Sequence, residues 1–308
     1  MTLQNLLDRL PQNPIVTKEL RRRMRGPRAF LLLVAYLVFL SLNISLIYLA
    51  FTLSTDEFSN IAERQRSMGK TIFGMVVLME LNLVTLISPA LTAGAIAAER
   101  ERQTFDLLYS TLLKPLALVS GKMTAALSFI LLLIIAAMPL QSIAFLVGGV
   151  ELPEVIIALI ILIVSAMAFT AIGLFFSSFI RRTLVATVTS YVTSIVILFF
   201  VPFLLFVLSL FVDIMAFPLR NDTVMMIVVD YASYTIGWIL VSMNPLAAAL
   251  ATELMILDNR NIFFTTLSIG NGYDFPVIAP WISYSVFFSL FSLVLIGLSV
   301  FFVNRIDQ

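Results

Sequence analysis

Very few side chains in this sequence could carry out covalent or metal chemistry. The chain contains neither cysteine nor histidine, so thiol chemistry, disulfides and the usual zinc sites are excluded. The one Gly-Lys-Thr run, Gly69 to Thr71, lacks the leading glycine of a phosphate-binding P-loop, because Arg64 occupies that position. Catalysis on this chain is therefore not expected, and the informative residues are polar groups in apolar surroundings.

The most unusual of these groups is Glu80, which lies near the middle of a long apolar run, with Asn82 two residues later. A carboxylate inside a bilayer costs several kcal/mol unless it is neutralised or hydrated. None of the other apolar runs contains a lysine or arginine that could pair with it. Two interpretations stay open: a hydrogen-bonded structural carboxyl group, or a group that lines a substrate path or gate.

Two further apolar runs carry polar side chains. Thr187, Ser190 and Ser194 share one face of a helix in one run, and Asn43 lies in another. Small hydroxyl residues allow membrane helices to pack closely. They could also form a subunit interface or a wall that faces the substrate, and both interpretations stay open.

A charged segment, residues 98–122, separates two of the apolar runs. A helix is predicted to continue from the preceding run through Glu99 and Glu101 and to stop at Pro115. Within it an apolar stripe at helical spacing is flanked by charge, and it consists of Phe105, Leu108, Tyr109 and Leu112. Such a stripe is costly in water unless a protein groove or the membrane surface covers it. We therefore expect either a loop that docks on a partner or an interfacial helix on headgroups.

Basic residues gather in the first 28 residues of the chain. Leucines at helical spacing predict one short amphipathic helix that Pro11 ends, and a second helix follows Asn13. The second helix has the pattern of one lying in the headgroup plane. The residues expected to bind the membrane surface are Lys18, Arg21, Arg22, Arg23, Arg25 and Arg28. They could only orient the first span and bind anionic lipid, or they could also carry movement from a cytoplasmic partner.

Membrane helices must position these groups. Of the 308 residues 60% are hydrophobic and 12% charged, whereas roughly a quarter are charged in a soluble domain. Several apolar runs reach the roughly 20 residues that cross a bilayer as a helix, and they lack the alternation of barrel strands. We therefore predict an all-α polytopic membrane protein. Its six spans are expected at about 29–51, 71–97, 123–147, 155–179, 184–212 and 281–303.

The distribution of charge predicts the orientation of these spans. An alternating topology places 14 of the 19 lysines and arginines on one side, which the positive-inside rule assigns to the cytoplasm together with both termini. Residues 213–280 then form an external segment. Within it residues 223–243 are apolar enough for a seventh span, but Asp230 and the Asn244-Pro245 pair favour a re-entrant or interfacial helix.

Two stretches resemble the permease subunits of ABC-2-type ATP-binding-cassette transporters. They are NPIVTKELRRRMRGPRAF before the first span and AGAIAAERERQTFDLLYSTLLKPLALVSGK after the second. The six-span plan and the long segment before the last span are similar to that family as well. Three positions depart from its pattern, because Gln103 replaces the usual glycine, Phe105 a common leucine and Leu113 a proline. The resemblance implies an ABC-2-type transmembrane domain over residues 29–308.

The resemblance also implies that the charged loop couples this chain to a separate ATPase. The residues that it places in contact with the ATPase are Glu99, Glu101, Thr104, Phe105, Asp106 and Leu108, and Tyr109 and Leu112 continue their stripe. ATP and Mg would be bound by that nucleotide-binding subunit, with no cofactor on this chain. The other expected partners are a second permease copy or paralogue and membrane lipid, without nucleic acid. The expected location is the plasma (inner) membrane.

The expected function is therefore that of a permease subunit, which forms a translocation path with a second permease and exports a substrate. Two alternatives remain. One is an ion- or proton-coupled secondary carrier that uses Glu80, against which the missing basic partner and the lack of visible inverted repeats both weigh. The other is a non-transporting subunit that anchors or scaffolds a larger complex through the charged loop.

Overall fold

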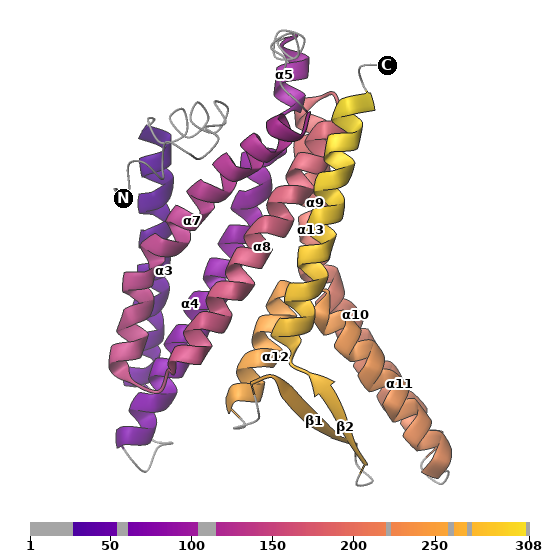
Figure 1. The fold of residues 1–308 in the computed structure, drawn as a ribbon. Helices are drawn as coiled ribbons and strands as arrows, with labels where there is room; N and C mark the ends of the chain where they lie inside the picture. Colours follow the sequence, from indigo (N-terminus) through magenta and orange to yellow (C-terminus); the bar gives the residue numbers. More distant parts are fainter. Residues whose placement is uncertain are drawn as a thin grey trace, which may run out of the picture.

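The chain folds into long helices and one short β-hairpin (Figure 1), and the computed structural model describes residues 27–53, 61–103, 115–219, 223–257, 262–269 and 273–305. The elements are α3 (Pro27–Leu53), α4 (Ile61–Thr92), α5 (Ala97–Glu101), α7 (Pro115–Val147), α8 (Leu152–Phe179), α9 (Thr183–Ile195), the π-helix η1 (Val196–Phe200), α10 (Val201–Leu219), α11 (Thr223–Ser242), α12 (Pro245–Leu257), β1 (Phe264–Ile269), β2 (Tyr273–Ile278) and α13 (Pro280–Arg305).

The bundle has two ends that serve as landmarks. α5 and the last turn of α13 lie at the end that we call the α5 end, and the β-hairpin lies at the opposite end, the hairpin end (Figure 1). α4 and α8 both begin toward the hairpin end.

Six helices are long and apolar enough to cross a membrane, which confirms the prediction of six spans. They are α3, α4 with α5, α7, α8, the continuous α9–η1–α10 helix, and α13. α4 and α7 begin at Ile61 and Pro115, well before the predicted starts at residues 71 and 123. Helical hydrogen bonding continues past the apolar layer, so hydropathy alone underestimates the length of these helices.

α8 is the central helix of the bundle. It packs along α4 and along α13 (Figure 1), and its side chains Ile161 and Phe169 are buried. Gly173 brings α8 against α4, because a Cβ atom at this position would lie 2.1 Å from the Thr92 hydroxyl oxygen. Lipid is as apolar as these side chains, so the helices are held together by close packing and polar contacts rather than by exclusion of water.

Hydroxyl groups join α13 to its neighbours. The oxygens of Ser165 in α8 and Tyr284 in α13 lie 2.7 Å apart, and both side chains are fully buried. The hydroxyl of Ser242, at the end of α11, donates to the hydroxyl of Ser283 at 2.8 Å. These contacts fix the register of α13 against two helices that packing of apolar side chains alone would leave free to slide.

The fifth span changes its hydrogen-bond pattern in the middle. Residues 196–200 form a π-helix between α9 and α10, a local widening that alters the pairing of nearby carbonyl groups. The buried side chain of Asn244 donates from Nδ2 to the carbonyl oxygens of Ile197 and Leu198, at 2.6 and 3.0 Å. Its Oδ1 accepts from the amide of Ala247 at 2.8 Å, in the first turn of α12. One side chain therefore joins the fifth span to the helix that follows.

α11 and α12 meet at a bend of 115° beside Asn244. Pro245 has no amide hydrogen and disfavours a helical conformation at the preceding residue, so the break falls here. Both outer ends of the pair lie toward the hairpin end (Figure 1). The pair therefore enters and leaves the bundle from the same end, unlike a straight seventh span.

A β-hairpin follows α12 and adds two short strands that the all-α prediction for the external segment missed. The strands pair antiparallel from Phe264 with Ile278 inward. The sequence between them, Gly270 to Gly272, contains the Asn-Gly pair that is typical of hairpins. The indole of Trp281 donates to the carbonyl oxygen of Ile262 at 2.9 Å, which ties the hairpin to the start of α13.

Several predicted features lie outside the described residues. They are the N-terminal amphipathic helices with Lys18, Arg21, Arg22, Arg23 and Arg25, and the stripe with Thr104, Phe105, Asp106, Leu108, Tyr109 and Leu112. Arg28 lies in the first turn of α3, where its backbone is described. The roles predicted for all these residues stay predictions.

Candidate functional site at the turn between α4 and α5

The helix that could run from the second span to Pro115 is interrupted before it reaches that residue. α4 ends at Thr92, a turn follows over residues 93–96, and α5 ends at Glu101. Gln103 then adopts a φ of 56°, in the left-handed region that glycine favours and other residues rarely enter. The resemblance expects glycine at this position, and the backbone geometry gives the physical reason for that preference.

The turn is fixed from α8 by Ser177. The Ser177 hydroxyl oxygen accepts hydrogen bonds from the backbone amides of Ile96 and Ala97, at 2.8 and 3.0 Å. Amides at the start of a helix have no partner within it, so a buried helix start needs such an acceptor. Ser177 and Ala97 are both fully buried. α5 therefore starts at a defined point on α8.

α7 fixes the same turn through Lys122. Its Nζ atom lies 2.7 Å from the carbonyl oxygen of Ala95 and 2.7 Å from Oε1 of Glu99. The side chain of Lys122 is 3% exposed and that of Glu99 is 23% exposed, so the pair is largely shielded from water. Removal of either partner from a shielded ion pair strongly destabilises the protein. In the sequence Lys122 is only the last residue of the charged segment 98–122, and sequence reasoning assigned it no contact.

α9 makes the third attachment. The Glu101 carboxylate accepts hydrogen bonds from both the backbone amide and the hydroxyl of Thr183 at the start of α9. A carboxylate at a helix start satisfies free amides and interacts favourably with the helix dipole. A Cβ atom at Gly94 would lie 3.1 Å from the Thr183 methyl group, so the turn also passes close to α9.

The α4–α5 turn is thus joined to three other spans. Glu99 and Glu101, two of the residues predicted to contact an ATPase, are brought to Lys122 and Thr183 inside this chain. Residues 104–114, which carry the apolar stripe, begin directly after it. Sequence reasoning missed Ser177, although a serine pair near the end of an otherwise very apolar helix was the available signal.

Glu80 lies in a different part of the bundle. It is fully buried, and Nε2 of Gln141 in α7 donates to its Oε2 at 2.6 Å. Tyr36 in α3 is its other polar neighbour. Gln141 lies within the third apolar run, and sequence reasoning did not identify it as the partner of Glu80. Asn82 bonds instead to the carbonyl oxygen of Leu78 in its own helix, at 3.3 Å.

The remaining predicted residues are not brought together with Glu80. Asn43 donates to the carbonyl oxygen of Phe39 in its own helix at 2.8 Å. Thr187, Ser190 and Ser194 likewise bond to the carbonyl oxygen four residues earlier. Ser190 and Ser194 are fully buried, which supports helix packing for these two. Within the described part of the chain no three acidic side chains gather in a way that could hold a metal ion.

A family model described as "ABC-2 family transporter protein" matches residues 13–303, which is nearly the whole chain. No curated protein matches the chain.

Proposed function

The chain belongs to the ABC-2 family of transporter permeases, and on this premise we propose that it is one membrane half of an exporter driven by a separate ATPase. Family membership implies the ATPase partner, whereas the direction of transport and the pairing with a second permease are our proposals. The α4–α5 turn is the observation that supports the proposal most directly.

The proposed coupling path begins at the stripe in residues 104–114. A docked ATPase that closes on ATP would displace this segment, and the displacement would reach the α4–α5 turn directly. From the turn it would pass to α7 through Lys122, to α8 through Ser177 and to α9 through Thr183. Contacts of this kind transmit strain because packed and hydrogen-bonded helices move as units.

Transport then requires two states of the membrane helices. Movement of α7, α8 and α9 relative to the remaining spans would open a path first toward one side and then toward the other. The ATPase must favour one of these states, and the substrate must bind the two states with different affinity, since otherwise neither would shift the equilibrium.

A second permease is proposed because two membrane-exposed surfaces remain. In the most apolar window of the α9–η1–α10 span 6% of residues are buried, and in that of α3 17% are. α10 and α11 pack on each other and extend away from the other helices at the hairpin end (Figure 1). Either lipid or a second permease can cover these faces. A translocation path between two permeases requires that one of the two faces contact the second permease.

The proposed orientation places the α5 end in the cytoplasm. Described cations at this end include Arg102, Arg181 and Arg305, and the basic N-terminal residues precede α3 at the same end of the sequence-derived topology. Because the chain has no cysteine, an Asp106→Cys variant tests the orientation directly. A membrane-impermeant maleimide added to intact cells should leave it unlabelled, and labelling from outside would overturn this orientation.

Isolation of the complex tests the function itself. We expect an ATPase with a P-loop to co-purify with this chain from its native membrane. Phe105→Asp and Leu108→Asp should each lower ATP hydrolysis by the isolated complex, because a charge in the docking stripe opposes burial. Phe264→Asp in the exposed hairpin is the matched control and should leave hydrolysis unchanged. A purified chain that transports alone on an ion gradient would contradict the proposal.

A further inference from the structure

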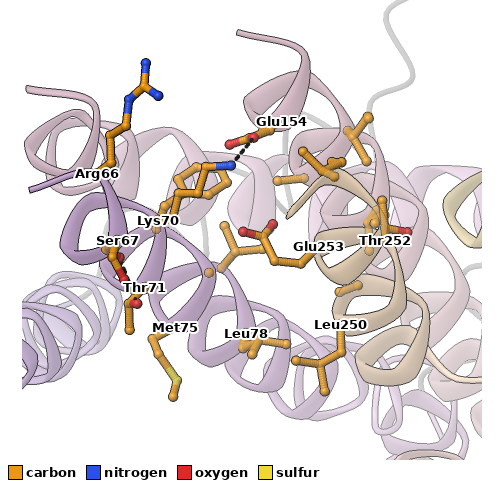
Figure 2. A pocket seen from close by; sticks show the side chains of 18 residues that line it. Arg66, Ser67, Lys70, Thr71, Met75, Leu78, Glu154, Leu250, Thr252 and Glu253 are labelled. Atoms are coloured by element: carbon orange, nitrogen blue, oxygen red, sulfur yellow. Dashed lines mark hydrogen bonds and ion pairs between the residues drawn. The ribbon is translucent and has the colours of Figure 1, made fainter. Parts of the chain in front are cut away.

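A cavity of about 620 Å³ lies between α4, α8 and α12 toward the hairpin end (Figure 2). Small-molecule sites in proteins usually measure about 300–1,000 Å³, so this volume is sufficient for an organic ligand. Neither Glu80 nor any residue of the α4–α5 turn lines it. The cavity is therefore separate from the residues considered so far.

Most of the cavity wall is apolar. Val77 and Leu78 line it from α4, Ile161 from α8, and Leu250 and Ile256 from α12. Such a wall accommodates a hydrocarbon or aromatic body and offers it no hydrogen bonds.

Most of the charged side chains around the cavity either pair with each other or point away from it. Lys70 pairs with Glu154, with 3.6 Å between Nζ and Oε1. Oε2 of Glu154 also accepts from the backbone amide of Glu151 at 3.3 Å, so both oxygens of Glu154 are engaged. The guanidinium group of Arg66 points away from the cavity (Figure 2). Glu154 and Lys70 therefore neutralise each other at the rim.

Glu253 is the charge that remains. It comes from α12, and its carboxylate reaches toward α4, where a Cβ atom at Gly74 would lie 3.9 Å from its Oε1 (Figure 2). Glu253 makes no hydrogen bond and no ion pair with any described residue. Glu253 shares the cavity wall with Glu154 and Lys70. A cation bound beside the carboxylate would favour its ionised form.

We propose that this cavity binds an organic cation with an apolar body, whose ammonium group pairs with Glu253 while the body lies along Val77, Leu78 and Ile161. A free amphiphilic amine and a lipid with an ammonium headgroup share this chemistry. That the ligand is cargo rests on the export function proposed above, whereas the binding itself does not.

Single-cysteine labelling tests the charge preference of the cavity. In the cysteine-free chain, Leu78→Cys places one thiol in the cavity and Leu146→Cys places one on the 84% exposed side chain of α7 toward the same end. Two small thiosulfonates, one with a trimethylammonium group and one with a sulfonate, are compared in phosphatidylglycerol nanodiscs, whose lipid has no ammonium headgroup. The ratio of cationic to anionic rates should be at least about five-fold higher at position 78 than at position 146, as expected for one nearby charge.

Removal of the Glu253 charge supplies the decisive comparison. Glu253→Gln should return the ratio at position 78 to that at position 146. Acidification should lower the ratio in the parent chain and leave the Gln variant unchanged. Equal ratios with and without the Glu253 charge would overturn the proposal. So would a thiol at position 78 that reacts with neither reagent while the thiol at 146 reacts with both.

A competition experiment tests binding and distinguishes the two ligand sources. Dodecyltrimethylammonium should slow labelling at position 78 several-fold, whereas dodecanol of the same chain length should not. Gly74→Leu, which fills the space beside Glu253, should abolish this protection, and Gly74→Ala should retain it because a Cβ atom fits there. Labelling that is slowed by nanodiscs containing phosphatidylethanolamine, before any amine is added, would assign the site to a lipid headgroup. No protection by either source would overturn the proposal.

These measurements need no ATPase. Failure to isolate an ATPase would therefore remove the export function and leave the cation site intact. Conversely, loss of charge selectivity at position 78 would remove the site and leave the coupling at the α4–α5 turn intact.

Discussion

Nζ of Lys122 in α7 lies 2.7 Å from Oε1 of Glu99 in α5 and equally close to the carbonyl oxygen of Ala95. The two charged residues are 23 positions apart in the sequence, and residues 104–114 lie between them. The pair therefore closes the base of the segment that is proposed to dock on the ATPase. A force on that segment reaches this contact through α5 on one side, and it reaches α7 directly at Pro115 on the other.

The first prediction concerns Lys122. Lys122→Met should destabilise the protein by about 2–3 kcal/mol, because it removes the contacts that Nζ makes with the Ala95 carbonyl oxygen and the Glu99 carboxylate in a largely buried site. Thermal unfolding of the purified chain in nanodiscs measures this effect. The double variant Glu99→Gln, Lys122→Met should be more stable than Lys122→Met alone, since it also removes the negative charge that pairs with Lys122. A double variant no more stable than the single one would contradict an ion-pair role.

The second prediction concerns the backbone at Gln103. Gln103→Gly should stabilise the protein by roughly 0.5–1 kcal/mol, because a left-handed conformation costs other residues about 1–2 kcal/mol and part of that gain is lost to the flexibility of glycine in the unfolded chain. Gln103→Val should destabilise it, since β-branched residues fit this conformation poorly. Melting temperatures of the three proteins should follow the order Gly, Gln, Val. The reverse order would argue against a positive φ.

The third prediction concerns Asn244. Asn244→Ala should destabilise the protein by about 2–4 kcal/mol, because the carbonyl groups of Ile197 and Leu198 and the amide of Ala247 lose their partner away from water. Asn244→Asp should be no better, since a carboxylate cannot donate to the two carbonyl groups. Denaturant unfolding measures both variants. Ser242→Ala, which removes the hydroxyl contact with Ser283 beside the same bend, is the milder control.

The fourth prediction separates a structural from a transporting role for Glu80. Glu80→Gln should keep its melting temperature and its ATP-driven function, because an amide oxygen can still accept from Gln141. Gln141→Leu should cost about 1–3 kcal/mol, because it leaves the buried carboxyl without this donor. Unfolding and ATP hydrolysis are measured side by side. Loss of function in Glu80→Gln with unchanged stability would instead support a titrating site.

The helices were predictable because each depends on the residue types within one continuous stretch of sequence. A run of about 20 apolar residues must be a helix in a bilayer, since no other structure satisfies its backbone groups there. The break at Asn244 was predictable for a similar reason, because Pro245 acts on the residues beside it. The hairpin also had a local signal, the Asn-Gly pair at positions 271 and 272, and sequence reasoning overlooked it.

The contacts between helices were not predictable, because each joins residues far apart in the chain. Glu80 and Gln141 are 61 positions apart in the sequence. Ser177 is 81 positions from Ile96, whose backbone amide donates to it. The sequence indicated that Glu80 needed a partner but not which helix supplied it. The turn at residues 93–96 was not predictable for another reason. Its alanines and glycine also occur within membrane helices, so they do not indicate a turn.

The three attachments of the α4–α5 turn have a consequence in rigid-body mechanics. A lever fixed at one point can pivot, and a lever fixed at two points can still rotate about the line between them. A body held at three points that are not in line can do neither. Because Lys122, Ser177 and Thr183 come from three different helices, a thrust on the turn is either passed on to those helices or breaks one of the three joints.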